Sequence, residues 1–427
     1  MSRRVYSSGS EQALTPCFLA TEGTFPEQIR VRSRYRTVLT DAETGIDRKS
    51  FSVDHEELDL GVSDAWRVVK YRLHGGLQEG VDVVEVFNGV LGFAVLPTRG
   101  MSILRGWYRD LDLGWDSPVK DPVHPAYVDL NDRGGLGWLK GFNEWIVRCG
   151  LDNNGAPGPD VVIDNNGNEA SVFLPLHGKI ANTPARHVAV EIDQDGTIAI
   201  TGQVDETMMF GPALRLTTRI STRVGTNEVR IEDRITNLNR KRAELQLLYH
   251  CNYGGPILEE GARLVAPVKR VVPRDATAVE GLEKHDRFSG PTSGFVEQVY
   301  FYDLASRRGS SETLLLLRNQ AGNVGSSLRY DKDALPCFTL WKNTAAREDG
   351  YVTGIEPATN FPNAKQFERD AGRVVTLRGK ETRTFLLTVA AHQGRADVRS
   401  VEQEIARIQG NRKPRIQARP GGGYAPV

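Results

Sequence analysis

Apolar and polar residues alternate along much of the chain, and short turns separate the alternating segments. Asn88-Gly89 lies between two apolar runs in residues 84–96, and both residues tolerate a positive φ, which is a strong hairpin signal. The same arrangement recurs around Asp195-Gly196 and around Gly225-Thr226-Asn227. Later strands are predicted at residues 245–249, 314–317, 338–341, 351–355, 374–377 and 384–389. Many short strands with Gly, Asn and Asp turns predict a mainly β fold, an antiparallel sandwich or barrel.

The two ends of the chain depart from this pattern. Residues 396–410 follow helical spacing, with branched aliphatic residues on one face and Gly410 as a stop, and predict one C-terminal helix. Residues 1–30 are polar and weakly patterned, which predicts a flexible N-terminal arm. Residues 411–427 are basic and glycine-rich, with little to bury, and predict a disordered tail. The main β domain is therefore expected to span residues 31–395.

A loop-rich insert is predicted at about residues 110–167. It contains Trp115, Trp138 and Trp145 among many Gly, Asn and Asp residues. Long loops on a β scaffold often carry binding sites, and aromatic rings beside hydrogen-bonding side chains suit carbohydrate. The three tryptophans would equally suit the core of such an insert, and the pattern alone leaves both interpretations open.

Charge and cysteine content restrict the partners. The 427 residues include 54 Lys and Arg and 54 Asp and Glu, which argues against nucleic acid or an anionic membrane surface as a partner. No stretch reaches the length of a membrane span, and the N-terminus has no apolar signal segment. The four cysteines are scattered without a CxxC pair and are expected to be reduced. We expect a cytoplasmic protein, monomer or homodimer, without nucleic-acid or membrane partners.

One carboxylate stands at the end of a predicted apolar strand. Glu356 follows residues 351–355 and directly precedes Pro357, and Gly354 leaves room beside the backbone for a ligand. Burial would raise the pKa of this carboxyl towards the range of a general base. The alternative is a salt bridge with an arginine, for which Arg99, also at a strand end, is one candidate.

Two histidines stand in comparable settings. In residues 245–252, alternation places His250 and Asn252 on one strand face and Tyr249 on the other. His177 lies between a Pro-Leu pair and Gly178, which would aim the imidazole from a strand end. A structural role is the alternative for each histidine. Glu297, Gln298 and Lys342 are further polar residues at the ends of predicted strands. If these strand ends lie on one sheet face, their side chains would together form a sugar-binding surface.

Several enzyme signatures are absent. The sequence has no GxSxG elbow, Walker A loop or dinucleotide fingerprint. No two histidines have the close spacing of a metal motif, so neither a metal nor another cofactor is expected. A divalent metal held by His177, His250 and a carboxylate remains an alternative.

Seven short motifs occur in order along the chain: His74-Gly75-Gly76 with Glu79-Gly80, Leu96-Pro97-Thr98-Arg99-Gly100-Met101, Cys149-Gly150-Leu151, Pro175-Leu176-His177-Gly178, Tyr249-His250-Cys251-Asn252, Glu297-Gln298-Val299-Tyr300 and Gly354-Ile355-Glu356-Pro357. This ordered set resembles the aldose 1-epimerase-like proteins of the DUF4432 group, within the galactose mutarotase superfamily, and the resemblance covers roughly residues 65–390. It implies an antiparallel β-supersandwich with few helices whose concave face binds sugar. It also implies that Glu356 is the general base, His250 the general acid and His177 a sugar ligand.

The resemblance also bears on the substrate. Sugar-phosphate epimerases with the same Pro-Leu-His-Gly string place an arginine shortly after it, whereas this chain has only Lys179, which argues against a phosphorylated substrate. Mutarotases use an Asp to contact the sugar, and Glu297 is the candidate for that position. The full set of expected substrate-binding residues is His177, Arg99, Glu297, Asn252, Gln298 and Lys342.

The main functional hypothesis is therefore an isomerase of carbohydrate metabolism that opens and recloses a sugar ring. The first alternative is an epimerase, lyase or hydratase acting on an oxidised or keto sugar, with a divalent metal as a candidate cofactor. The second is a non-catalytic carbohydrate-binding protein that uses Trp115, Trp138 and Trp145 for recognition.

Overall fold

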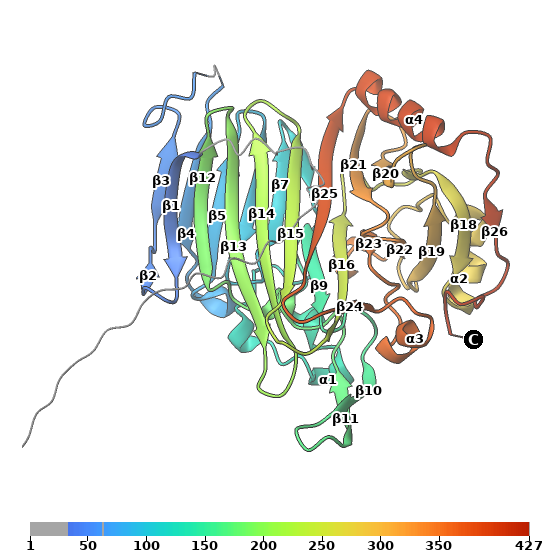
Figure 1. Ribbon diagram of the computed structural model, residues 1–427. Coiled ribbons are helices and arrows are strands. Elements are labelled where there is room, and N and C mark those ends of the chain that lie inside the picture. Colours follow the sequence, from blue (N-terminus) through green and yellow to red (C-terminus); the bar gives the residue numbers. More distant parts are fainter. Residues whose placement is uncertain (1–32, 62–63, 427) are drawn as a thin grey trace, which may run out of the picture. The chain divides into compact units, whose positions relative to one another are not determined.

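Two large antiparallel sheets pack face to face and enclose the main hydrophobic core (Figure 1). The computed structural model describes residues 33–61 and 64–426. The predicted N-terminal arm, residues 1–30, lies outside the described residues. The predicted fold class, a mainly β antiparallel supersandwich, is confirmed.

The first sheet has ten strands. In spatial order they are β17 (Arg263–Val265), β20 (Glu312–Arg318), β21 (Val324–Asp331), β25 (Thr382–Gln393), β15 (Glu228–Asn237), β14 (Ala213–Arg223), β13 (Thr197–Thr207), β12 (His187–Asp193), β1 (Ser33–Asp41) and β2 (Ile46–Asp47). Buried residues alternate with partly exposed ones along β13, β14 and β15, as a sheet with one covered face requires.

The second sheet has fourteen strands and carries the site described below. Its path runs through β26 (Arg415–Ile416), β18 (Val268–Pro273), β19 (Gln298–Leu304), β22 (Cys337–Asn343), β23 (Val352–Ala358), β16 (Ala243–Tyr253), β9 (Ile146–Leu151), β7 (Ser102–Tyr108), β6 (Leu91–Leu96), β5 (Asp82–Phe87), β4 (Arg67–Arg72) and β3 (Phe51–Asp54), with β24 (Val375–Leu377) beside β16 and β8 (Leu111–Leu113) beside β7.

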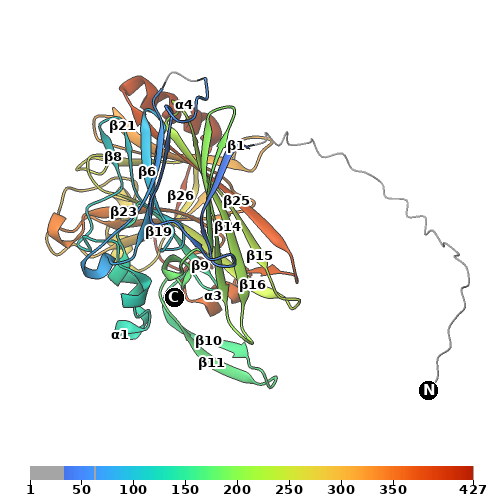
Figure 2. The same cartoon turned by 90° about the vertical axis from the view of Figure 1, so that its left-hand side faces the viewer.

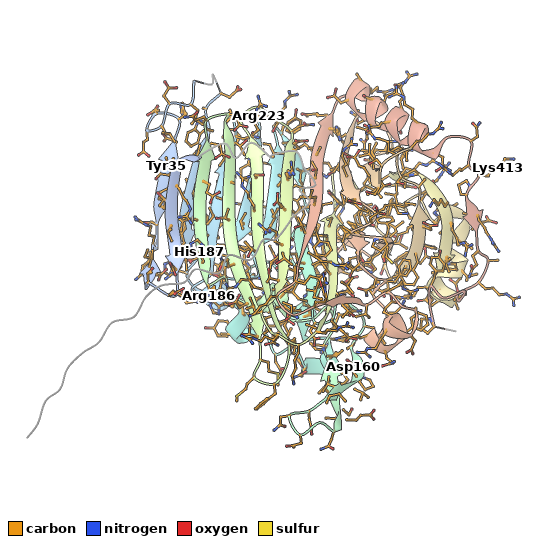
Figure 3. All side chains as sticks on the ribbon, viewed as in Figure 1. Tyr35, Asp160, Arg186, His187, Arg223 and Lys413 are labelled. Carbon is orange, nitrogen blue, oxygen red and sulfur yellow. The ribbon has the colours of Figure 1, made fainter. Side chains whose placement is uncertain are left out.

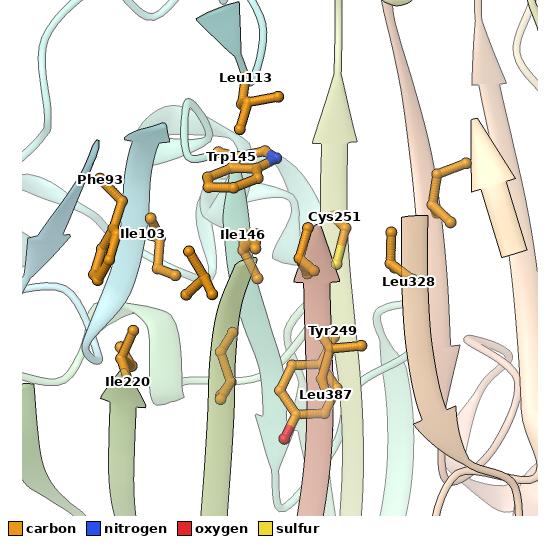
Figure 4. Close-up of a cluster of buried hydrophobic side chains, with 14 of the residues drawn as sticks. Phe93, Ile103, Leu113, Trp145, Ile146, Ile220, Tyr249, Cys251, Leu328 and Leu387 are labelled. Carbon is orange, nitrogen blue, oxygen red and sulfur yellow. The ribbon is translucent and has the colours of Figure 1, made fainter. Parts of the chain in front are cut away.

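The core between the sheets is filled from both sides. Phe93 and Ile103 come from the fourteen-stranded sheet, and Ile220 and Leu387 come from the ten-stranded sheet (Figure 4). Tyr249 on β16 also faces this core. Since neighbouring residues of a strand point to opposite faces, the residue after Tyr249 points away from the core.

The Asn-Gly hairpin predicted at residues 88–89 is confirmed. Gly89 has φ 101° and joins β5 to β6. The Asn88 side chain is fully buried and does more than form the turn: its Nδ2 donates to Thr222 Oγ1 and to two backbone carbonyls of the β14–β15 connection. The turn therefore connects the two sheets at the ends of interior strands, which the local sequence pattern does not reveal.

Strand β23 runs through Glu356 and Pro357, so the prediction that the strand stops before Glu356 is wrong. Proline has no backbone N–H and is usually absent from central strands. Pairing between β16 and β23 is present at Leu248–Ala358 and again from Cys251–Ile355, and it is interrupted between them. On the other side, β22 pairs with β23 without interruption. The proline therefore opens one ladder at Glu356 without ending the strand.

Four α-helices occur among the described residues, where the sequence indicated one. The predicted C-terminal helix is present as α4 (Arg395–Gln409) and packs on β20, β21 and β25. The short helices are α1 (Asp132–Gly135), α2 (Ala276–Glu280) and α3 (Lys365–Asp370), and the 3-10 turns are η1 (Gly76–Gln78), η2 (Pro125–Tyr127), η3 (Gly137–Gly141), η4 (Ile180–Asn182), η5 (Leu282–Lys284) and η6 (Arg347–Asp349). None of the described helices is long and apolar enough to cross a membrane.

The prediction of a disordered tail is wrong for residues 411–426. After α4 the chain passes through Lys413 (Figure 3), and β26 then pairs in parallel with β18. Tyr424 packs on Phe361, with ring centroids 5.3 Å apart, and Ala425 is buried beside Phe361. A few apolar contacts near the chain end fix a segment whose average composition is polar.

The insert at residues 110–167 is more ordered than its composition indicated. It contains β9, a central strand of the fourteen-stranded sheet. It also contributes β10 (Gly158–Ile163), which pairs with β11 (Glu169–Leu174) in a separate two-stranded hairpin that projects from the body (Figure 2). The remaining turns, including η3, lie close to the exposed face of the large sheet, as the contacts below show.

Candidate active site

Strands β22, β23 and β16 are neighbours in the fourteen-stranded sheet (Figure 1). One polar residue on each of them, Thr339, Glu356 and His250, forms a row across the sheet. Thr339 pairs directly with Glu356, and the register on either side of the interruption places His250 opposite Glu356. Residues opposite each other in an antiparallel pair have Cβ atoms about 4.5–5.5 Å apart. The Thr339–Glu356–His250 row lies on the face of the sheet turned away from the core.

A glycine makes room for this row. Gly354 is two residues before Glu356 on the same face, and it pairs with Trp341 on one side and Asn252 on the other. A Cβ at Gly354 would lie 2.4 Å from Glu356 Oε1 and 2.9 Å from His250 Cε1. The sequence suggested that Gly354 leaves space for a ligand, whereas the structure fills much of that space with the two side chains themselves.

Asn252 sets the tautomer of His250. Asn252 Nδ2 donates to the backbone carbonyls of Glu144 at 2.9 Å and His250 at 3.1 Å, so its Oδ1 is the acceptor that faces the imidazole. His250 Nδ1 therefore carries a hydrogen and donates to Asn252 Oδ1 at 2.5 Å. His250 Nε2 is left facing Glu356 Oε1 at 3.2 Å.

The environment disfavours charge on both groups. Glu356 is 2% exposed, and burial, followed by the nearby Glu297 charge, raises its pKa well above the ordinary value. Burial, followed by the proximity of His177, lowers the pKa of His250 to about 3. Although the two atoms are close, Glu356 Oε1 has no hydrogen-bond partner among the described residues. Burial therefore opposes a charge on each group of the His250–Glu356 pair.

His177 approaches the row from a strained turn. Its φ is 59°, and Gly178 follows with φ 72°. A Cβ at Gly178 would lie 2.2 Å from the Asn153 carbonyl oxygen, so only glycine fits there. His177 Nδ1 donates to the Asn154 carbonyl at 2.8 Å, and burial lowers its pKa to about 4. The neutral ring keeps Nε2 as a hydrogen-bond acceptor.

Aromatic rings surround the two histidines. The ring centroids of Trp138 and His177 are 4.7 Å apart. The ring centroid of His250 lies 5.2 Å from that of Phe142 and 5.4 Å from that of Trp341. The rings and the polar row enclose a cavity of about 290 Å³. Apolar walls with a few converging polar groups are typical of a small-molecule site.

An ion pair lies at the exposed side of this cavity. Glu297 Oε1 accepts from Arg274 Nη2 at 2.9 Å, and Glu297 Oε2 accepts from Trp341 Nε1 at 2.7 Å. Arg274 also pairs with Asp275 at 2.8 Å. Both Arg274 and Glu297 line the cavity, and the sugar contact expected of Glu297 stays a prediction.

Arg99 does not line the cavity, and the expectation that it binds substrate is corrected. It is 1% exposed, and its guanidinium donates to Glu144 Oε1 at 2.9 Å and to Asn182 Oδ1 at 2.9 Å. Two further bonds reach the Val123 and Gly141 carbonyls. All these partners are protein groups, so Arg99 holds together the turns around η3.

Three other candidates have their side chains occupied elsewhere. Lys342 points into the core side, where Nζ donates to the carbonyls of Lys284 at 3.0 Å and Arg287 at 2.7 Å. Gln298 Oε1 accepts from the Tyr300 hydroxyl at 3.1 Å, away from the cavity. Asn252 acts on His250 and does not line the cavity. For these residues and Arg99, a position at a strand end did not determine the direction of the side chain.

The tryptophans divide between site and core. Trp138 lines the cavity, whereas Trp145 lies in the core between the sheets (Figure 4) and Trp115 donates to the Glu144 carbonyl. Trp341, Arg274 and Thr339 line the cavity and were missed as site residues. Strand alternation put Thr339 and Trp341 on one face of a predicted strand, which was a usable signal, but nothing in the sequence pointed to Arg274.

The metal alternative lacks a matching ligand set. Within residues 33–61 and 64–426, no group of three or more His, Cys, Asp and Glu side chains could hold a metal ion. His177 and His250 have ring centroids 5.5 Å apart, but the Nδ1 atoms of both already donate hydrogen bonds to protein oxygens.

Comparisons with known proteins identify the family and the fold. The family model described as a domain of unknown function, DUF4432, matches residues 78–391. A search of curated proteins finds no significant match. One similar solved structure is that of a candidate aldose 1-epimerase from Klebsiella pneumoniae subsp. pneumoniae MGH 78578, which is 38% identical in sequence. The alignment covers 90% of this chain and 98% of the Klebsiella chain, and the two structures superpose with a TM-score of 0.84.

A more distant structure shows the fold alone. A galactose mutarotase-like protein from Clostridium acetobutylicum is 13% identical, covers 81% of this chain and 100% of its own, and has a TM-score of 0.53. The family match spans well over half of the sequence and includes the whole Thr339–Glu356–His250 row. The chain therefore belongs to the DUF4432 family and has the fold of the galactose mutarotase-like proteins.

Proposed function

We propose that this protein is an aldose 1-epimerase, an enzyme that interconverts the anomers of a sugar by opening and reclosing its ring. The observation that carries the proposal is the buried pair of His250 Nε2 and Glu356 Oε1, 3.2 Å apart at one wall of an aromatic cavity. The similarity to the Klebsiella protein, named a candidate aldose 1-epimerase, supports the same reaction.

The reaction needs one proton donor and one proton acceptor at the same time. Glu356 takes the proton of the anomeric hydroxyl while His250 delivers a proton from Nε2 to the ring oxygen. The ring opens, the C1–C2 bond rotates, and closure with the roles reversed gives the other anomer. We assign the binding of sugar hydroxyl groups to His177 and Glu297, which line the same cavity.

The proton inventory of the pair is compatible with this reaction. Burial favours the neutral form of the pair, so ring opening starts once the proton of Glu356 has moved across the 3.2 Å gap to His250 Nε2, which leaves Glu356 as the carboxylate base and His250 as the doubly protonated acid. Asn252 accepts from His250 Nδ1, so it holds Nε2 towards Glu356 in either form. Since the two groups exchange roles between ring opening and closure, one proton on the pair supplies a donor and an acceptor in both directions.

Anomer exchange measured by NMR across a panel of free aldoses tests the proposal. We expect the wild-type protein to exceed the buffer rate for at least one sugar, and Glu356→Gln and His250→Gln to lose about a hundred- to ten-thousandfold of that rate. Glu283→Gln, at an exposed position on η5, should keep wild-type activity.

Two results would count against the proposal. Exchange no faster than buffer for every sugar would contradict it outright. Sugar-dependent tryptophan fluorescence that persists in Glu356→Gln, without any turnover by the wild type, would instead support a non-catalytic carbohydrate-binding protein. Trp138 and Trp341 line the cavity and would report such binding.

A further inference from the structure

One hydroxyl in the cavity has no partner. Thr339 is fully buried, lines the cavity, and its Oγ1 makes no hydrogen bond to any described residue. Buried polar side chains are paired in the large majority of cases, and an exception calls for an explanation. A ligand group that enters the cavity is one such explanation, because a hydroxyl can both donate and accept.

The position of Thr339 limits which ligand group this is. Thr339 pairs with Glu356 from β22, on the side opposite to His250. The order across the sheet is therefore His250, Glu356, Thr339. In the proposed reaction, His250 serves the ring oxygen and Glu356 serves the anomeric oxygen. Around the anomeric carbon of an aldose, the group on the other side of C1 from the ring oxygen is C2 with its hydroxyl.

We propose that Thr339 Oγ1 binds the C2 hydroxyl of the substrate and that the enzyme acts on 2-hydroxy aldoses in preference to 2-deoxy sugars. This inference rests on the proposed function, since the order of the three oxygens assumes ring opening by the Glu356–His250 pair. A 2-deoxy sugar fills the same cavity but leaves Thr339 unpaired. Sites built to bind a hydroxyl discriminate strongly against the analogue that lacks it.

The experiment compares matched sugar pairs in two variants. The pairs are glucose with 2-deoxyglucose and galactose with 2-deoxygalactose, and the variants are Thr339→Val and Thr344→Val. Valine keeps the shape of threonine and replaces its hydroxyl with a methyl group. Thr344 is a matched control, because it is also buried with an unpaired Oγ1 but does not line the cavity. Anomer exchange gives kcat/KM, and tryptophan fluorescence gives Kd without requiring turnover.

We expect the wild-type protein to prefer each 2-hydroxy sugar at least about tenfold, which is ~1.4 kcal/mol. Thr339→Val should lose this preference by slowing only the 2-hydroxy sugars, while Thr344→Val should keep it. An equal effect of Thr339→Val on both members of a pair, or a wild-type protein without preference, would overturn the inference. If no sugar is turned over, the proposed function fails, and the Kd ratios decide the role of Thr339. Absence of any sugar binding overturns both.

Discussion

The backbone of Gly354 lies so close to Glu356 that a methyl group on it would be 2.4 Å from Oε1. The same methyl group would be 2.9 Å from Cε1 of His250. Gly354 has no positive φ, so its backbone would accept any residue. The need for glycine therefore comes from the two side chains above it.

Gly354→Ala should remove activity and leave the fold intact. The added methyl group must displace Glu356 or His250, and displacement of either breaks the 3.2 Å approach of the pair. We expect the rate of anomer exchange to fall at least about a hundredfold, which is the lower end of what acid–base catalysis contributes. Circular dichroism and NMR exchange rates on the same sample measure both properties.

Gly158→Ala provides the control for this substitution. Gly158 also lies in a strand without a positive φ, and a Cβ there would meet no atom within 4 Å. This variant should keep wild-type exchange. If Gly354→Ala exchanges anomers as fast as Gly158→Ala, the close contact with Glu356 has no role in the reaction.

Arg99→Met should lower stability and leave the site chemistry of the folded protein unchanged. The substitution leaves the Glu144 carboxylate buried, at 0% exposure, without its cation. Removing one partner of a buried ion pair costs about 3–5 kcal/mol of unfolding free energy. Urea unfolding of Arg99→Met and of Arg105→Met, an exposed arginine on β7, measures this difference, and the second variant should lose less than about 1 kcal/mol.

The opposite result would restore the expectation from the sequence. A sugar ligand at Arg99 predicts a raised KM with little change in the free energy of unfolding. A lowered free energy of unfolding with an unchanged KM supports the structural role seen in the contacts of the guanidinium group.

His177 should make the protein sensitive to acid. Burial lowers the pKa of its imidazole from 6.5 to about 4. The unfolded chain takes up this proton below pH 6.5, whereas the folded protein takes it up only near pH 4. Above pH 6.5 His177 is neutral in both states and does not change the free energy of unfolding. Between pH 6.5 and about 4, this free energy falls as the pH falls, by about 1.4 kcal/mol per pH unit.

His177→Asn tests this dependence, because asparagine carries no titrating group and tolerates a positive φ like the 59° seen here. The free energy of unfolding is measured in urea at several pH values between 7 and 4. It should fall less steeply with falling pH in the variant, because unfolding of the variant takes up one proton fewer. Identical slopes in the two proteins would mean that the pKa of His177 is the same in the folded and unfolded states.

The sequence predicted the pair at the centre of the site but not its surroundings, and the reason is strand register. Period-two alternation and the Asn88-Gly89 turn are local signals, and they were sufficient for the strands and for the face on which His250 lies. The pairing of Glu356 with Thr339, and its position opposite His250, depend on which residues of three strands face each other. No local pattern contains that information.

Side-chain direction beyond a strand end was equally inaccessible. Arg99 and Lys342 were expected at the substrate because they follow or end apolar runs, yet both donate to backbone carbonyls of neighbouring turns. Arg274 was missed because it sits at the end of β18, and only the pairing of β18 with β19 brings it to Glu297. Contacts between segments far apart in the sequence determine the side-chain direction of all three residues.

The docked C-terminal segment gives the last prediction. Ala425 is 2% exposed and packs in a cluster with Val272, Phe301 and Phe361. Ala425→Asp places a carboxylate among these apolar side chains, and we expect a loss of about 1–3 kcal/mol of unfolding free energy, as for other polar groups that are moved out of water. Ala418→Asp introduces the same charge at an exposed position of the same segment and should change stability by less than about 0.5 kcal/mol. Thermal unfolding of the two variants measures the contrast directly. Equal melting temperatures would mean that residues 411–426 leave the body in solution, as their composition alone predicts.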